Sequence, residues 1–156
     1  MKKLTVLLIA SAVIAAGCAS MGGSGKTDFS SVAGSEWILS EVRGPAQTIT
    51  LNRETNSDNF TLQFGDNEGQ PLISGKAAPN RYFGPYTLGD NQAITFEPGM
   101  GLTRMANMPA GAEDLTEDEF IAYLGNVVKW SLDGRNLQLH SISENGTETV
   151  LVFEVL

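Results

Sequence analysis

The chain has 156 residues, with 18 acidic against 10 basic side chains and a formal net charge of -8. This length suits one domain, and the acidic balance argues against nucleic acid as a partner, because nucleic acid requires clustered Lys and Arg. An apolar fraction of 42% with 18% charged residues excludes general disorder. One cysteine excludes an internal disulfide and a zinc site built from several cysteines.

The first eighteen residues have the pattern of a bacterial export signal. Lys2 and Lys3 form a positive start, and residues 4–16 are uncharged and mostly apolar. This run is too short to span a hydrocarbon core, which takes about 20 residues, but it has the length of a signal-peptide core. Small residues then precede Cys18, which is the only cysteine of the chain.

The segment Ile14 to Cys18 resembles a lipobox, the cleavage site of bacterial lipoproteins. The resemblance implies that residues 1–17 are a signal peptide and that Cys18 carries a diacylglycerol and an N-acyl chain, which anchor the protein in a membrane. Lipoproteins kept in the inner membrane often carry Asp after the cysteine, so Ala19 favours the outer membrane facing the periplasm. An ordinary secretory signal followed by an unmodified cysteine is the alternative.

Residues 18–31 are interpreted as the lipidated Cys18 followed by a flexible tether. The segment is rich in Gly and Ser and has no apolar periodicity. Gly22 to Thr27 looks like the end of a phosphate-binding loop, but Ser20 stands where that motif needs its first glycine. We therefore expect no nucleotide site here and a single folded domain over residues 32–156.

From about Val32 onward apolar and polar residues alternate, which is typical of strands with one face toward water. The clearest runs are 60–64, 86–88, 94–96, 128–132 and 137–140. In residues 128–132 the alternation places Val128, Trp130 and Leu132 on one face. Turn sequences separate the runs, at 89–91, 133–134 and 145–146. The last run, 150–155, is apolar on both faces apart from Glu154, which indicates a central strand.

One segment, residues 116–125, has helical spacing instead. Thr116 and Glu119 have the spacing of a capping box, and Phe120 and Leu124 fall on one helix face. Gly125 can end the helix. The predicted fold is therefore mainly β, a small curved antiparallel sheet or a partly closed β-barrel with one inserted α-helix at about 116–125.

Several segments, taken in order, resemble the META domain family of HslJ-like proteins. They are Trp37-Ile38-Leu39, Asn-Arg-Tyr-Phe-Gly-Pro-Tyr at 80–86, Leu-Thr-Arg-Met-Ala at 102–106, Glu119-Phe120 with Leu124, and Trp-Ser-Leu-Asp-Gly at 130–134 with Leu137 and Leu139. The likeness covers roughly residues 32–156. It implies a small, mainly β domain, often lipid-anchored or secreted and linked to envelope stress, with no established reaction.

This chain departs from the family at two positions where many members have cysteine. Pro79 and Asn107 stand there instead. A redox or disulfide role suggested for other members therefore does not carry over to this chain.

Five residues are candidates for a binding site: Asn80, Arg81, Tyr82, Tyr86 and Arg104. The two arginines can pair with an anionic group, or each can serve an internal ion pair. The two tyrosines are four residues apart on one predicted strand and so share a face, which offers either a stacking surface or a pair at the edge of the core. Asn80 suits a turn.

No catalytic or metal-ligating constellation is recognisable. His140 is the only histidine and is expected to face solvent, and the chain has no Gly-x-Ser-x-Gly motif. The acids at 113–119 lack the spacing of a calcium loop. We therefore expect no catalytic residue, no metal and no cofactor other than the covalent lipid on Cys18.

The leading hypothesis is a non-catalytic binding module of the cell envelope that recognises an envelope protein or polymer. One alternative is a carrier of a small apolar ligand in a barrel-like cavity. That alternative needs an open interior, and filling by Trp37, Phe64, Trp130 and Phe153 would exclude it. The other alternative is a hydrolytic enzyme with dispersed carboxylates.

Overall fold

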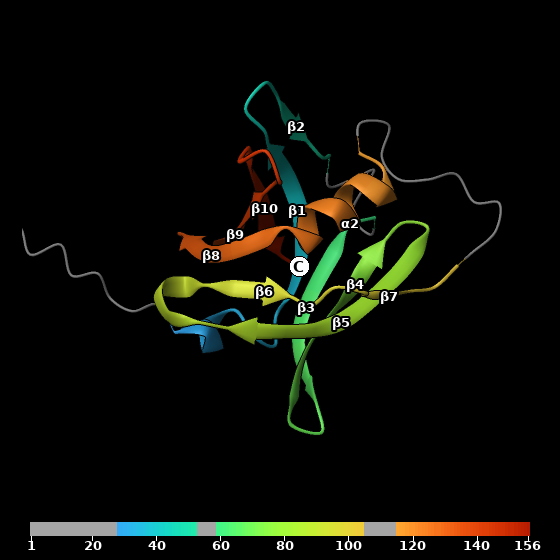
Figure 1. Cartoon of the computed structure of the whole chain (residues 1–156), viewed down its shortest axis with the longest axis vertical. Coiled ribbons are helices and arrows are strands. Elements are labelled where there is room, and N and C mark those ends of the chain that lie inside the picture. The colour runs from blue at the N-terminus through green and yellow to red at the C-terminus, as the bar shows by residue number, and fades with distance from the viewer. Residues whose placement is uncertain (1–27, 53–58, 105–114) are drawn as a thin grey trace, which may run out of the picture.

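Antiparallel strands make up most of the structure, a computed structural model that describes residues 28–52, 59–104 and 115–156 (Figure 1). The strands are β1 (Glu36–Arg43), β2 (Thr48–Thr50), β3 (Thr61–Asn67), β4 (Gln70–Ala77), β5 (Asn80–Leu88), β6 (Ile94–Phe96), β7 (Gly101–Leu102), β8 (Val127–Asp133), β9 (Asn136–Ile142) and β10 (Glu148–Val155). The helices are α2 (Glu117–Gly125) and the short 3-10 turns η1 (Phe29–Ser31) and η2 (Asp90–Gln92). The expected signal peptide, Cys18 and residues 19–27 of the expected tether lie outside the described residues.

The strands form one sheet that curls almost into a barrel. Their order is β6-β5-β4-β3-β1-β10-β9-β8, with β2 added to β1 and β7 added to β5. The two ends of this order meet at a single antiparallel bridge between Ala93 and Lys129, which leaves one seam. The expected mainly β fold with a partly closed barrel is confirmed.

Side chains fill the interior of the barrel. Trp37, Phe64, Trp130 and Phe153 are each 3% exposed or less and belong to one apolar cluster. A ligand carried inside the barrel needs an open interior, and these four side chains occupy that space. The alternative of a carrier with an internal cavity therefore gains no support from the structure.

The predicted helix is confirmed, and α2 closes one end of the barrel. Thr116 caps it, and both hydrogen bonds of the capping box with Glu119 are present. The Phe120 ring packs against Phe60 at 4.9 Å and Phe153 at 6.5 Å between ring centroids. Because Phe153 lies on β10 and Phe60 precedes β3, the helix contacts inward-facing residues from two sides of the barrel rather than an outer face.

η1 lies at the other end of the barrel from α2 (Figure 1), and a second aromatic cluster packs beside it. The Phe29 ring lies 5.0 Å from both Phe64 and Trp130, in edge-on arrangements. Asp28 caps η1 by accepting a hydrogen bond from the Ser30 amide. Residues 28–31, which were expected to belong to the tether, are therefore attached to the core through the Phe29 side chain.

One expected inward residue points outward. Val128 was placed on the inner face with Trp130, but it is 44% exposed, and Val127 is buried in its place. The pairing of β8 with β9 shifts register between Val127 and Lys129, which marks a β-bulge. A bulge adds one residue to a strand and so inverts the alternation on one side of it. The prediction for Val128 was wrong for this reason.

The last strand is central, as its sequence predicted. β10 pairs with β1 on one side and with β9 on the other. Leu151 and Phe153 point into the core, and Val152 between them is 1% exposed on the opposite face. The predicted β8–β9 and β9–β10 turns are also present, since Gly134 and Gly146 have φ of +63° and +82°.

The capping box of α2 predicts a pH-dependent contribution to stability. Hydrogen bonds from the amide and the hydroxyl of Thr116 lower the pKa of Glu119 below its ordinary value. The carboxylate therefore stabilises the fold above the unfolded pKa, and this contribution is lost as the pH falls through the folded pKa. We expect Glu119→Gln to lower the free energy of unfolding by about 0.3–1 kcal/mol at pH 7 and by much less at pH 3. Urea titrations at the two pH values measure this difference.

Asp118→Asn is the matched control, because Asp118 lies in the same helical turn but outside the capping box. A pH dependence of the same size for both variants would assign the effect to the helix dipole alone. The capping hydrogen bonds would then add no measurable stability beyond that of the helix dipole.

Candidate functional site

Alternation along β5 divides the candidate residues into two groups. Asn80, Tyr82 and Tyr86 are buried, whereas Arg81 and Phe83 between them are exposed. Successive residues of a strand point to opposite faces. The inward group therefore holds the fold together, and the outward group is available to a partner.

Asn80 connects three parts of the fold. Its side-chain amide donates a hydrogen bond of 2.7 Å to the Glu117 carboxylate in the first turn of α2. Its side-chain oxygen accepts from the Thr103 hydroxyl at 3.4 Å. Asn80 is only 9% exposed, so it positions α2 and the segment after β7 against the start of β5.

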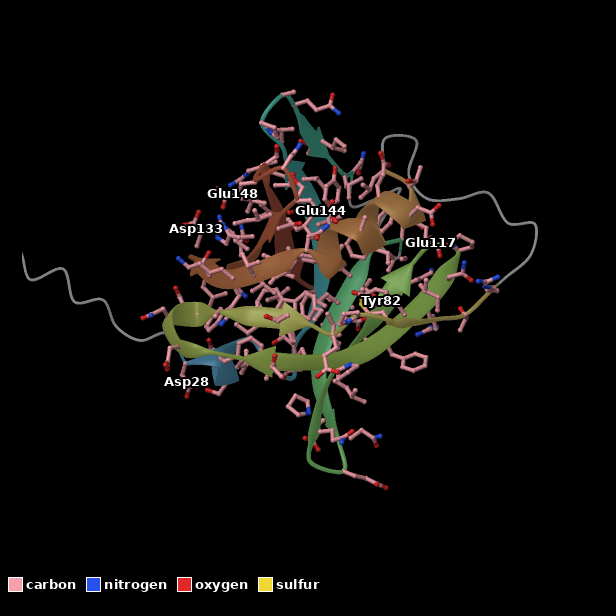
Figure 2. All side chains as sticks on the ribbon, in the orientation of Figure 1. Asp28, Tyr82, Glu117, Asp133, Glu144 and Glu148 are labelled. Carbon is pink, nitrogen blue, oxygen red and sulfur yellow. The ribbon has the colours of Figure 1, made fainter. Side chains whose placement is uncertain are left out.

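Tyr82 lies inside the barrel and is 1% exposed. Its hydroxyl donates a hydrogen bond of 2.7 Å to the backbone oxygen of Thr61. Burial raises the pKa of this phenol far above its ordinary value. Figure 2 shows Tyr82 at the centre of the molecule, among the strands. The side chain is part of the core and presents no surface for stacking.

Tyr86 is also mostly buried, at 6% exposed, and packs within the aromatic cluster beside η1. Its ring lies 5.2 Å from Phe64, edge-on. Burial raises the pKa of Tyr86, and the negative charge of Asp66 raises it further. The two tyrosines share the inner face, as their spacing predicted, but they belong to opposite ends of the barrel.

Arg81 lies on the outer face of the sheet directly opposite Lys76 of β4. Neither cation forms an ion pair within the described part of the chain. Like charges directly opposite one another on a sheet destabilise it. An anion bound between the two side chains would remove this repulsion.

Phe83 extends the same outer face and is 56% exposed, an unusual exposure for a large aromatic side chain. Its ring lies over Gly101, its cross-strand partner on β7, so closely that a Cβ at Gly101 would collide with it. The absence of a side chain at Gly101 therefore leaves room for the ring to lie against the sheet. Lys76 and Phe83 were missed in the sequence, although the position of Phe83 two residues after Arg81 already implied a shared face.

Arg104 directly follows Thr103, which is hydrogen-bonded to the backbone of Arg81. The backbone amide of Thr103 donates a hydrogen bond of 2.9 Å to the Arg81 oxygen, and the Arg81 amide donates to the Thr103 hydroxyl at 2.9 Å. Arg104 follows at once and is exposed. We name the group of exposed Arg81, Phe83 and Arg104 and half-buried Lys76 the β4–β5 face.

The acidic side chains labelled in Figure 2 lie on both sides of the barrel. Asp133 and Glu148 lie near β8–β10, whereas Glu117 lies near β4 and β7, where it accepts a hydrogen bond from Asn80. The chain carries a net charge of -8, so a group of three cations, two of them exposed, with no ion pair among the described residues stands out. Its charge suits an anionic partner.

A hydrogen-bonded chain of Ser131, His140 and Glu148 crosses the outside of β8–β10. The Ser131 oxygen lies 3.1 Å from His140 Nε2, and His140 Nδ1 lies 2.8 Å from a Glu148 oxygen. This is the order of nucleophile, base and acid in serine hydrolases. Sequence reasoning missed it because the three residues lie on different strands and only their register brings them together.

The surroundings of these three residues do not suit acyl transfer. The Glu148 side chain is 56% exposed, whereas the acid of a serine triad is buried and so orients the histidine firmly. Ser131 lies within a strand rather than at a strained turn, and its hydroxyl also lies 3.3 Å from Gln138. We interpret the group as a cross-strand ladder that stabilises the sheet.

Neither a metal site nor a membrane span is found in the described parts of the chain. No group of three or more His, Cys, Asp and Glu side chains there can hold a metal ion. No described helix has the length and apolar character needed to cross a membrane.

The pKa of Asp28, like that of Glu119, is lowered by the hydrogen bonds of a helix cap.

Comparison with known proteins identifies the fold and the family. The META domain family model matches residues 30–154. An NMR structure of a protein from Burkholderia xenovorans is 25% identical, covers 80% of this chain and 83% of that chain, and gives a TM-score of 0.60. A crystal structure of a DUF4847 family protein from Bacteroides vulgatus is 15% identical, covers 78% and 92%, and gives a TM-score of 0.52, which is a likeness of fold alone. A search of curated proteins found no match.

Proposed function

Since the chain belongs to the META domain family, we propose that it is a lipid-anchored, non-catalytic binding module of the bacterial cell envelope. The β4–β5 face is its recognition surface, and its partner is an envelope protein or polymer that carries negative charge there. Residues 1–17 are the signal peptide, and lipid on Cys18 anchors the chain in the outer membrane, facing the periplasm. The link to envelope stress follows from the family resemblance.

The observation that carries this proposal is the cross-strand pair of Lys76 and Arg81. An acidic protein that places two of its few cations opposite each other, with no ion pair for either among the described residues, retains a repulsion that a bound carboxylate or phosphate would relieve. Arg binds such groups through two parallel hydrogen bonds. Phe83 beside them supplies the exposed aromatic contact typical of interface hot spots.

The lipid, rather than the protein surface, supports membrane attachment in this proposal. Each buried methylene of an acyl chain contributes about 0.8 kcal/mol, so several chains together hold a protein stably. An acidic domain gains nothing from an anionic membrane surface. The cations of the β4–β5 face therefore remain available for a partner.

Photo-cross-linking in intact bacteria tests the recognition surface. A photoreactive phenylalanine analogue replaces Phe83 in the full-length chain, and mass spectrometry identifies the products. We expect one dominant adduct, which disappears when Lys76 and Arg81 are both changed to Ser. The same probe at Val128 is the matched control, because Val128 is an exposed apolar residue (44%) on a different strand, β8, which β6 separates from β5 around the barrel.

Each outcome decides the assignment. An adduct that forms equally from position 128, or that survives the loss of both cations, means that the β4–β5 face is not the recognition surface. A protein adduct identifies an envelope protein as the partner, and a carbohydrate adduct identifies an envelope polymer. A probe at Tyr82 faces the core and is expected to give no adduct.

The non-catalytic part of the proposal predicts that Ser131 is unreactive. A fluorophosphonate adds covalently to an activated serine, and the intact mass of the chain reports the adduct. We expect no adduct at neutral pH, because the exposed Glu148 does not hold His140 as a buried acid does. An adduct at Ser131 that is lost in His140→Ala would contradict this part of the proposal.

A further inference from the structure

A pocket of about 430 Å³ opens beside η1, at the end of the barrel away from α2. Its walls come from Phe64 of β3, Tyr86 of β5, Pro71 of β4 and the Ala33–Gly34 segment after η1. Asp66 is the charged residue among those that line it. A concave, largely apolar site with a few convergent polar groups is the usual form of a small-ligand site.

The Tyr86 hydroxyl is an unused polar group at this pocket. Tyr86 is 6% exposed, and its hydroxyl has no hydrogen-bond partner among the described residues. No side-chain polar atom there is both buried from solvent and unpartnered, so the hydroxyl is accessible. Tyr82, on the same strand and the same face, bonds its hydroxyl to Thr61. The difference leaves Tyr86 with one donor and one acceptor for a ligand.

Asp66 brings a negative charge to the same place. It is two residues from Phe64 on β3, so the two side chains leave the strand on the same side. The Gly69 amide donates a hydrogen bond of 2.8 Å to one carboxylate oxygen in the β3–β4 turn, which fixes the side chain. Asp66 has no ion pair among the residues that the structure describes. After burial, its negative charge is the second cause that raises the pKa of Tyr86.

We infer that this pocket binds an ammonium group carried on a short apolar stem. The Asp66 carboxylate supplies the counter-charge, and the Tyr86 oxygen accepts a further hydrogen bond from the ammonium. The apolar residues of the lining cover its stem. Asp66 repels an anion, so this site selects the opposite charge from the β4–β5 face. A free amine and a lysine side chain share the required chemistry.

An NMR titration of the full-length chain in a non-ionic detergent tests this inference. The probes are n-butylammonium, neutral 1-butanol and the butyrate anion, and the readout is the amide signals of Gly34 and Gly65. We expect the affinity to fall in that order. Nα-acetyl-lysine methylamide is a fourth probe: tighter binding of butylammonium identifies a free amine as the source, and tighter binding of the lysine derivative identifies a protein side chain.

Two conservative variants keep the fold and test the polar groups. Asp66→Asn retains the acceptor for the Gly69 amide, and Tyr86→Phe retains the packed ring. We expect Asp66→Asn to weaken butylammonium binding about ten- to a hundredfold, because it removes a charge-assisted hydrogen bond. Asp133→Asn, an exposed acid on β8, is the matched control and is expected to change nothing.

Three results would overturn the inference: no amide shifts with either amine, equal binding of 1-butanol and butylammonium, or unchanged binding in Asp66→Asn. The pocket would then be an apolar depression without charge selectivity. The double change of Lys76 and Arg81 to Ser is expected to leave the ammonium titration unaltered. Failure of this inference and failure of the proposed recognition surface are therefore separate results.

Discussion

Replacing Phe120 with Ala is expected to lower the free energy of unfolding by about 3–5 kcal/mol. Phe120 is 0% exposed and stands at the closed end of the barrel, where its ring meets Phe60, Tyr82 and Phe153. Loss of the ring removes its burial and leaves a cavity among three aromatic side chains that cannot collapse into it without moving strands. Urea unfolding followed by the fluorescence of the buried Trp37 and Trp130 measures the change.

Two further variants show whether packing causes the loss. Phe120→Leu refills part of the volume and is expected to lose less than Phe120→Ala. Ile121→Ala removes a partly buried apolar side chain from the next position of the same helix and is also expected to lose less. Equal losses at positions 120 and 121 would mean that α2 contributes through its own helical stability rather than by closing the barrel.

Replacing Gly75 with Ala is expected to cost about 3 kcal/mol or more. A Cβ at Gly75 would collide with the backbone oxygen of Thr61 and with the Tyr82 hydroxyl, which are bonded to each other. The backbone oxygen cannot move aside as the end of a flexible side chain can. The strands must therefore separate, and the buried phenol loses its only described acceptor.

Gly65→Ala is the matched control for this prediction. Gly65 lies on the neighbouring strand β3, and its added Cβ would meet nothing closer than the Leu72 oxygen at 3.9 Å, an ordinary contact. The same urea titration is expected to show little loss. If Gly75→Ala costs no more than Gly65→Ala, the close approach of β3 to the Tyr82 hydroxyl does not constrain the sheet.

Local patterns in the sequence determined the class of the fold and many of its elements. Alternation of apolar and polar residues indicates strands because successive side chains point to opposite faces, and it placed Leu137 and Leu139 correctly in the core. The capping box indicated the start of α2 because it depends on Thr116 and Glu119 alone. The doubly apolar run 150–155 marked the central strand β10. Each of these signals involves residues close together in the chain.

The same alternation along β5 also predicts which residues of the candidate site share a face. It places Arg81 and Phe83 on one face and Tyr82 and Tyr86 on the other. Which face points outward depends on which is buried by the rest of the chain. The partner of Arg81 depends on the β4–β5 register, so Lys76 entered the site only with the structure.

Tertiary structure alone decided the features that depend on distant residues. The bulge at Val128 arises from pairing with β9, and α2 closes the barrel because Phe120 meets side chains of β5 and β10. The ladder from Ser131 to Glu148 and the pocket between Tyr86 and Asp66 likewise join residues from separate strands. Sequence periodicity describes one strand at a time, whereas these sites exist only where the register of several strands brings side chains together.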